Sequence, residues 1–164
     1  MKSTLRPLML TVALATGALP ALAADTPSPP PPSAAPARLA DPLAPARMHI
    51  LGKRWPAAID ELRKVNATGN ADWNNLMGYA LRKQASPDLD GAQRYYDAAL
   101  RLEPQHRGAL EYSGELALMK GDLATAEKRL AALSQACGSA GCEELADLQK
   151  AVARFKSNGN RYAP

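Results

Sequence analysis

Two cysteines carry the most specific chemical signal in the sequence. Cys137 and Cys142 enclose the tetrapeptide Gly-Ser-Ala-Gly. In an exported protein, two cysteines this close together are expected to form a disulfide. A redox-active pair is the alternative, but the spacing is not Cys-x-x-Cys and nothing around it indicates a thioredoxin-like sheet. We therefore predict a disulfide that fixes the segment following it.

The histidines and carboxylates give no comparable signal. His49 and His106 are the only histidines, and neither lies in a cluster with metal-ligand spacing. A zinc site built from His106 and the two thiols would need reduced cysteines and would still lack a ligand. The sequence also has no nucleophile motif, no phosphate-binding glycine loop and no isolated carboxylate pair. It predicts no catalytic residue, no metal ion and no cofactor.

The charge pattern argues against nucleic acid as a partner. The net charge of the whole chain is +4. Residues 1–23 contain Lys2 and Arg6 but no acidic residue, so 18 basic minus 16 acidic residues leave +2 for the remainder. Basic and acidic residues are also interleaved along the predicted helices, as over residues 60–64. A phosphate-binding surface would instead gather the basic residues on one side.

Residues 1–23 have the features of a cleavable secretory signal. A short basic start precedes an apolar run over residues 8–19, and Pro20 separates that run from the small-x-small site at residues 21–23. The apolar run is too short to span a bilayer, which needs about 20 residues. We expect cleavage after Ala23, a periplasmic location, and no stable membrane insertion of the mature chain.

Residues 24–45 are rich in proline and alanine, with four consecutive prolines at positions 29–32. Such a segment cannot bury apolar surface, so we expect a disordered, extended linker. Proline-rich runs are also ligands for aromatic-lined grooves, which is a second interpretation of this segment.

From residue 46 onwards, small and large apolar residues recur at intervals of 34. The three recurring sets are Ala58, Ala92 and Ala126; Leu62, Tyr96 and Leu130; and Val65, Ala99 and Leu133. The spacing within each copy places these side chains on one stripe of a helix. Each copy therefore predicts a helix with a small contact point, where a neighbouring helix can approach, and a larger side chain beside it.

A second helix of each copy is indicated by two apolar segments with a central glycine. Gly78 lies in the segment 76–80 and Gly114 in the segment 112–116, and we expect these segments to open their helices. The two glycines are 36 residues apart, and the excess over 34 falls in a loop near Pro87 and Asp88, which we expect to start the next helix. Pro104 is expected to end that helix.

These residues resemble the tetratricopeptide repeat. One repeat is carried by Trp73, Leu76, Gly78, Ala92, Tyr96, Ala99 and Pro104, and a second by Gly114, Gly121, Ala126 and Leu130. The resemblance implies an all-α solenoid of about three helix pairs over residues 46–157, capped by a helix at 143–156, before a disordered tail at 158–164. The C-terminal part, with its cysteine-bracketed loop, also resembles small exported repeat proteins of proteobacteria.

The resemblance further implies a binding groove, because the first helix of each pair lines the concave side of such stacks. Seven residues would line it, namely Asn75, Tyr79, Arg82, Lys83, Glu111, Glu115 and Leu118. Such a surface suits an extended peptide or a partner helix. The alternatives are that these side chains are solvated, or that Arg82 and Glu115 pair with each other across the repeats. The basic clamp of family members that bind C-terminal carboxylates is not reproduced.

The function expected from the sequence is a protein–protein interaction module in the cell envelope, with a protein or peptide partner that the sequence does not identify. A short groove favours a transient complex with a Kd of about 1 µM and a monomeric protein. Two alternatives are a thiol-dependent redox protein that uses Cys137 and Cys142, and a self-assembling structural protein whose repeat ends stack.

Overall fold

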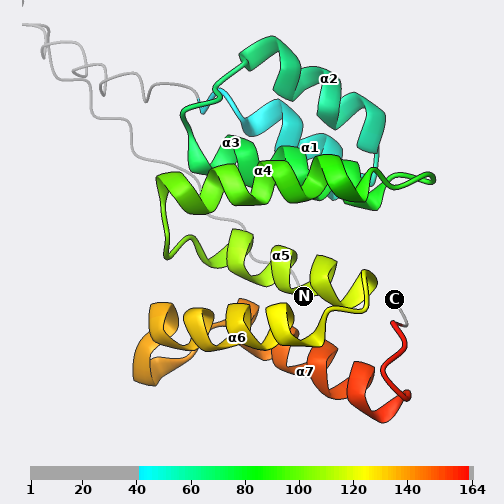
Figure 1. The fold of residues 1–164 in the computed structure, drawn as a ribbon. Coiled ribbons are helices and arrows are strands. Elements are labelled where there is room, and N and C mark those ends of the chain that lie inside the picture. The colour runs from blue at the N-terminus through cyan, green and yellow to red at the C-terminus, as the bar shows by residue number, and fades with distance from the viewer. Residues whose placement is uncertain (1–40, 163–164) are drawn as a thin grey trace, which may run out of the picture. The chain divides into compact units, whose positions relative to one another are not determined.

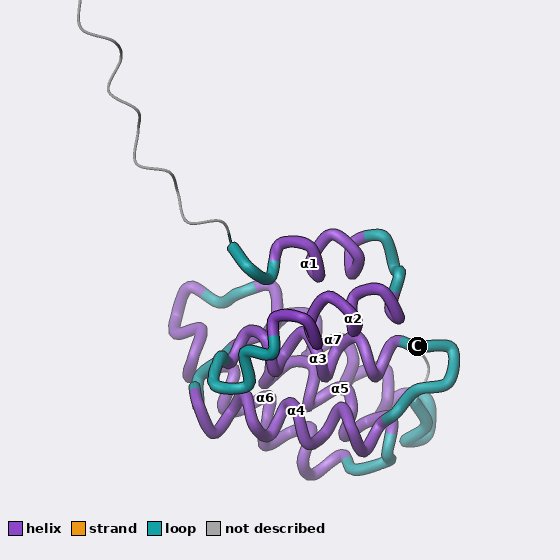
Figure 2. The backbone as a smooth tube through the Cα atoms, turned by 90° about the horizontal axis from the view of Figure 1, so that it is seen from above, coloured by secondary structure: helices purple, strands orange, loops and turns teal. Residues whose placement is uncertain are grey.

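The computed structural model describes residues 41–162, and this part of the chain contains helices and loops but no strand (Figures 1 and 2). Its elements are α1 (Ala44–Leu51), α2 (Trp55–Val65), α3 (Ala71–Lys83), α4 (Leu89–Leu102), α5 (Arg107–Met119), α6 (Leu123–Cys137), a 3₁₀ turn (Gly138–Ala140) and α7 (Glu143–Ser157). The prediction of an all-α, repeat-like fold is confirmed. The predicted signal at 1–23 and most of the linker lie outside the described residues.

The helices are stacked in consecutive pairs (Figure 1). α1 packs on α2, α3 on α4 and α5 on α6, while α7 covers both α5 and α6 at the end of the stack. Short turns connect neighbouring helices, which therefore reverse direction from one to the next. As a result α3 and α5 also touch each other, and the side chains along that contact form the site described below.

Four helices begin with a side chain that accepts a hydrogen bond from the first turn, namely α3 with Asn70, α4 with Asp88, α5 with His106 and α6 with Asp122. Asp88 starts α4 as the sequence predicts. The predicted starts of the first helices at 76 and 112 are wrong, because α3 and α5 each begin five residues earlier. Asn70 and His106 satisfy the exposed N–H groups there and allow the additional turn.

The repeat positions lie in the interior. Eight of the nine predicted packing residues are buried, namely Ala58, Leu62, Gly78, Ala92, Tyr96, Ala99, Gly114 and Ala126. Leu130 is half-buried and packs against the cluster formed by α5, α6 and α7. The three alanines have no exposed surface, so the small residue of each copy marks a close helix contact.

Two glycines show how close these contacts are. A Cβ atom on Gly78 would lie 2.8 Å from the ring of Tyr96, within the same helix pair. A Cβ atom on Gly114 would lie 2.7 Å from a methyl group of Leu148, which belongs to α7. The two equivalent glycines thus contact different helices: Gly78 contacts α4 of its own pair, whereas Gly114 contacts the capping helix α7.

The ordered unit extends beyond the predicted boundaries at both ends. The predicted linker at 24–45 overlaps α1, which begins at Ala44 and is preceded by the buried Leu43. Pro45 lies in the first turn of that helix, where a missing N–H group costs nothing.

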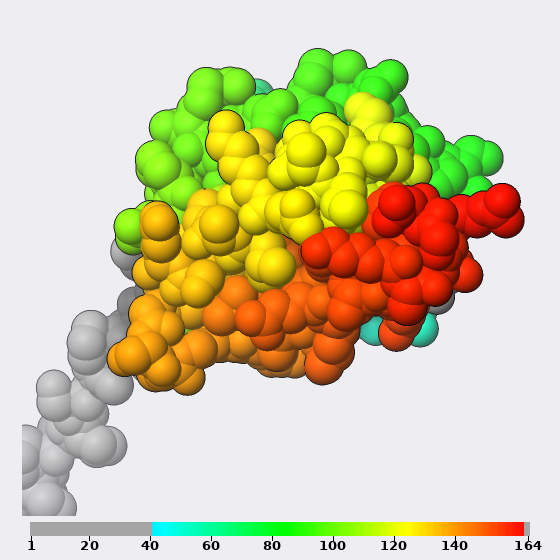
Figure 3. Space-filling model, turned by 60° about the horizontal axis from the view of Figure 1, so that its bottom comes forward, coloured from blue at the N-terminus to red at the C-terminus, as the bar shows by residue number. Residues whose placement is uncertain are grey.

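At the other end a disordered tail was predicted for residues 158–164, but residues 158–162 turn back toward the stack. The Asn158 side chain donates a hydrogen bond to the Arg161 carbonyl at 3.2 Å, and Tyr162 packs against the cluster around α7. Figure 3 shows this red segment beside the yellow turn between α5 and α6. Residues 163–164 lie outside the described part.

Cys137 and Cys142 form a disulfide that joins the end of α6 to the residue before α7, with 5.6 Å between their Cα atoms. The predicted bond is therefore present. Both sulfurs belong to half-buried residues that pack against the cluster around α7. Within residues 41–162, none of the helices has the length and apolar character needed to cross a membrane.

Candidate functional site

All seven residues predicted to line a groove lie on α3 and α5, but they differ in exposure. Lys83 is exposed, and Tyr79 and Glu115 are half-buried. The remaining four are buried, namely Asn75, Arg82, Glu111 and Leu118. The site is therefore a partly buried polar and aromatic cluster along the contact between the two helices.

Arg82 and Glu115 form an ion pair between α3 and α5. Arg82 Nη2 lies 2.6 Å from Glu115 Oε2, and the exposed fractions of the two side chains are 1% and 23%. Burial lowers the pKa of Arg82, but the neighbouring Tyr96 and the Glu115 carboxylate raise it more. The predicted alternative, in which these two residues pair across the repeats, is the arrangement that the structure has. Arg82 therefore has a structural partner.

Two tyrosine rings lie beside the guanidinium of Arg82. Its Cζ lies 5.6 Å from the ring centre of Tyr79 and 5.5 Å from that of Tyr112, within the range of cation–π contacts. The two rings are 4.5 Å apart, and Trp55 meets Tyr79 edge-on at 5.8 Å. Three half-buried aromatic rings from α2, α3 and α5 thus lie in one continuous row, which we name the aromatic row.

The aromatic row was only partly predicted. Tyr79 was expected in the groove, whereas Trp55 and Tyr112 were not. Tyr112 follows Glu111 directly and precedes Glu115 by three residues, so its position on the same side of α5 was available from helical spacing. Trp55 is the first residue of α2, so the spacing of residues within α3 or α5 could not predict its position.

Leu118 does not line a groove, and the prediction for this residue is wrong. Its exposed fraction is 1%, and it belongs to the core cluster that joins α5, α6 and α7. The capping helix packs against this end of α5 and covers the position that would face a groove in a longer stack.

Lys83 and Asn75 mark two ends of the site on α3. The Lys83 ammonium lies 5.9 Å from the ring centre of Tyr79 and is otherwise exposed. Asn75 packs against the start of α5 next to Gly108, with 6% of its surface exposed. Its Oδ1 is enclosed and accepts no hydrogen bond within residues 41–162.

Glu111 lies one turn before Glu115 on α5 and is surrounded by like charges. Burial raises the pKa of Glu111 to about 8. Three neighbouring carboxylates act in the same direction, those of Glu115, Asp147 and Glu144. Arg82 acts in the opposite direction but is already paired with Glu115. Glu111 is thus held largely protonated at neutral pH in the protein alone.

A cavity of about 360 Å³ adjoins the cluster and is lined by Arg82, Lys83, Met119 and Tyr162. The C-terminal residues therefore form one wall of the site, which the sequence did not indicate. Burial raises the pKa of Tyr162, and Arg82 lies close enough to lower it in part. Among the described residues, no group of three or more His, Cys, Asp or Glu side chains could hold a metal ion.

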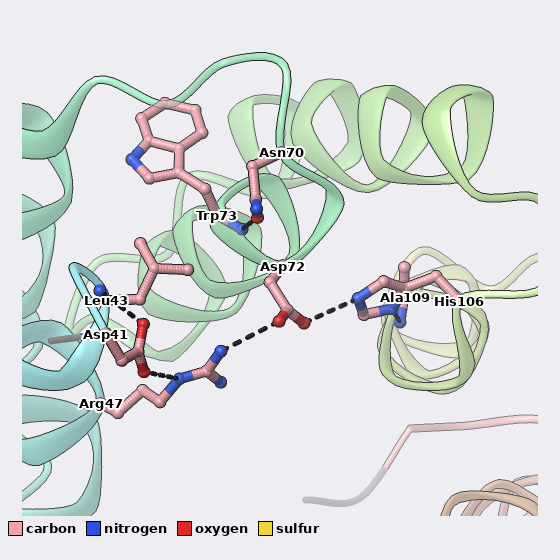
Figure 4. Close-up of polar contacts among 8 residues, drawn as sticks. All are labelled: Asp41, Leu43, Arg47, Asn70, Asp72, Trp73, His106 and Ala109. Atoms are coloured by element: carbon pink, nitrogen blue, oxygen red, sulfur yellow. Dashed lines mark hydrogen bonds and ion pairs between the residues drawn. The ribbon is translucent and has the colours of Figure 1, made fainter. Parts of the chain in front are cut away.

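A polar network at the start of α3 connects three helix pairs (Figure 4). Asp72 accepts hydrogen bonds from Arg47 of α1 and from His106 Nε2, each at 3.0 Å. His106 Nδ1 in turn accepts the Ala109 N–H group at 3.1 Å. Burial acts to raise the pKa of Asp72, but the bonds from His106 and Arg47 lower it overall. We assign this network a structural role, because each of its polar groups already has a partner.

No protein-family model matches the chain, and the comparison with curated proteins gives no match.

Proposed function

We propose that the chain is an exported protein–protein interaction module of the tetratricopeptide type, and that a peptide or helix of a partner protein binds on the aromatic row and the charged residues beside it. The aromatic row (Trp55, Tyr79 and Tyr112) supplies the contact area. Lys83 and Glu115 flank it with opposite charges. The observation that carries this proposal is the continuous contact of three incompletely buried rings across three helices.

The chemistry of the row supports binding for two reasons. Tyrosine and tryptophan are enriched among residues that dominate interface energies, because each brings a large contact area at a small entropic cost. Tyr79 and Tyr112 also contact Arg82, which is itself fixed by its pair with Glu115, so little ordering is required when a partner binds.

The expected complex is small and transient. Three rings and two charged side chains cover less than the roughly 800 Å² per partner of a standard interface. An affinity near 1 µM, about −8 kcal/mol, is therefore expected.

Export is supported by two independent features. The first 23 residues have the pattern of a cleavable signal. The Cys137–Cys142 bond is of a kind that persists in oxidising compartments and is rare in the cytosol. We propose a periplasmic location on this basis.

Site-specific photo-crosslinking in intact cells tests the proposed surface. A photoreactive phenylalanine analogue at Lys83, beside Tyr79, is expected to give a discrete crosslinked product with a partner, and the same analogue at the exposed Arg94 of α4 is not. Tyr79→Ala or Tyr112→Ala should remove the product. Equal products from both positions, or none from Lys83, would contradict the proposal.

Self-association is the second candidate. Met48 and Leu51 are 61% and 76% exposed on α1, at the end of the stack opposite α7. Apolar side chains there could pack against a second copy, as the sequence alternative of stacked repeat ends requires. A single monomeric species in sedimentation velocity from 10 to about 500 µM would remove this candidate, because an end contact should populate dimers in that range.

A further inference from the structure

Glu111 is a buried carboxyl group without a partner in the described part of the chain. Only 8% of its surface is exposed, and it takes part in no hydrogen bond or ion pair among residues 41–162. Neither carboxyl oxygen of Glu111 is completely enclosed without a partner, so the carboxyl group still reaches the surface. A carboxylate in this position normally has a partner, because burying an unpaired charge is costly.

The cation that acts most strongly on Glu111 is already engaged, because Arg82 is paired with Glu115 at 2.6 Å. On α7, Glu144 and Asp147 add further negative charge. The strongest charges around Glu111 are therefore one paired cation and three carboxylates.

A second acceptor without a partner lies nearby on α3. Asn75 touches the start of α5 at Gly108, one turn before Glu111. Its Oδ1 is enclosed and lacks a donor, although the residue is only 6% exposed. Glu111 and Asn75 are thus acceptors without a described donor on adjacent helices, and of the two only the Glu111 carboxyl group reaches the surface, where an N–H donor of a ligand can meet it.

Within the protein, one organic cation is already held by a carboxylate and aromatic rings. The guanidinium of Arg82 is held by the Glu115 carboxylate and by the rings of Tyr79 and Tyr112. Glu111 lies one turn before Glu115 and directly before Tyr112. A second organic cation at Glu111 would thus contact the Glu111 carboxylate with the Tyr112 ring next to it, the same pairing of carboxylate and ring that holds Arg82. A divalent metal ion fits less well, because the described residues hold no cluster of ligands for it.

We propose that Glu111 binds an ammonium or guanidinium group of the partner, so that the segment recognised by this protein presents a lysine or arginine side chain between α5 and α7. This inference rests on the proposed function, because the cation is taken to belong to the partner protein. Glu111 binds it as a carboxylate, so a proton leaves Glu111 on binding and binding tightens as the pH rises toward 8. The groups that also bear on this step are Glu115, Arg82, Glu144 and Asp147.

The test uses two small probes with the purified, disulfide-bonded chain. N-acetyl-arginine methylamide carries the guanidinium, and N-acetyl-citrulline methylamide is its neutral isostere. The ¹³C resonance of the Glu111 carboxyl group is followed from pH 5 to 10 with and without each probe. The arginine probe, at saturation, is expected to lower the midpoint of that titration by about one pH unit, which corresponds to a tenfold preference for the ionised form. The citrulline probe should leave it unchanged.

Two variants make the test specific. Glu111→Gln should weaken binding of the arginine probe at pH 8 at least about tenfold. Glu103→Gln removes the same charge from an exposed residue that forms no ion pair in the described part, and should change binding less than twofold. Equal shifts with both probes, or equal losses in both variants, would overturn the proposal. Photo-crosslinking from Lys83 reports the partner independently, so a failed cation site and a failed interaction function give different results.

Discussion

Gly78 on α3 packs directly against the ring of Tyr96 on α4. A Cβ atom at Gly78 would lie 2.8 Å from Tyr96 Cε1 and 3.1 Å from the Ala92 carbonyl oxygen. Tyr96 has no exposed surface and cannot turn away. The close approach of these two helices, and with it the position of the aromatic row, therefore depends on the missing side chain.

Gly78→Ala is expected to lower the free energy of unfolding by about 1–2 kcal/mol, because crowding of the ring outweighs the gain in helix propensity. Gly114→Ala should cost less, since the atoms that it meets most closely are the methyl ends of the flexible Leu148 side chain, whereas Gly78 faces a rigid ring and a backbone oxygen. Gly69→Ala, with no atom within 4 Å of the new Cβ, is the control and should change stability by less than about 0.5 kcal/mol. Urea unfolding followed by tryptophan fluorescence measures all three. A loss at Gly114 equal to that at Gly78 would contradict this account.

The Arg82–Glu115 pair should respond unequally to the loss of each partner. Glu115→Leu leaves a guanidinium with a 1% exposed side chain, and is expected to cost about 3 kcal/mol. Arg82→Met leaves a carboxylate with 23% exposure, which water can partly solvate, and should cost about 1 kcal/mol. A double-mutant cycle that includes Arg82→Met with Glu115→Leu measures the coupling. Equal losses in the two single variants would show that burial does not set the difference.

The sequence predicted the stack better than the surface. Periodicity at 34 residues identified Ala58, Ala92 and Ala126, because one helix face must be small wherever another backbone approaches. It could not show that Leu118 is core, since that depends on α7 packing against the end of α5. Nor could it place Trp55 beside Tyr79, because the geometry between α2 and α3 is set by packing and not by spacing along either helix.

Helix starts were a second weakness, with a local cause. Asp88 is an ordinary N-cap residue and marks the start of α4 correctly. His106 performs the same role through Nδ1, and histidine is not among the residues that a capping rule selects. The first turn of α5 was missed for this reason.

Glu111 should make the protein less stable as the pH rises. Its pKa is about 8 in the folded protein against an ordinary value of 4.5. The folded state therefore retains a proton that the unfolded chain loses, so stability falls between about pH 4.5 and pH 8 and levels off above. Glu111→Gln should remove this dependence and be more stable by about 1–2 kcal/mol at pH 9, after allowance for partial solvation. Unfolding in urea at pH 5, 7 and 9 tests it. A wild type and variant with parallel profiles would exclude Glu111 as the source.

His106 should contribute to the stability of the fold mainly as the N-cap of α5. His106→Asn retains an acceptor for the Ala109 N–H group but cannot reach Asp72, and is expected to cost less than about 0.5 kcal/mol. His106→Ala loses both bonds and should cost about 1 kcal/mol. Thermal unfolding of both variants separates the two contributions. Equal losses in the two variants would assign the main role to the bond with Asp72, because both variants lack it.

The disulfide should stabilise α7 without taking part in thiol exchange. Cys137 and Cys142 are five positions apart, and closing so short a loop removes unfolded-chain entropy worth roughly 2 kcal/mol. Replacing both with serine should therefore lower stability by about that amount and speed amide hydrogen exchange in α7 before α3 or α4, because only α7 is tied to α6 by the bond. Wild type treated with reductant should behave as the double variant does, and reductant should leave the double variant unchanged. Rapid equilibration of the bond with a dithiol at neutral pH, together with unchanged exchange in α7, would instead favour the redox alternative, since a purely structural link resists exchange while it holds the helix in place.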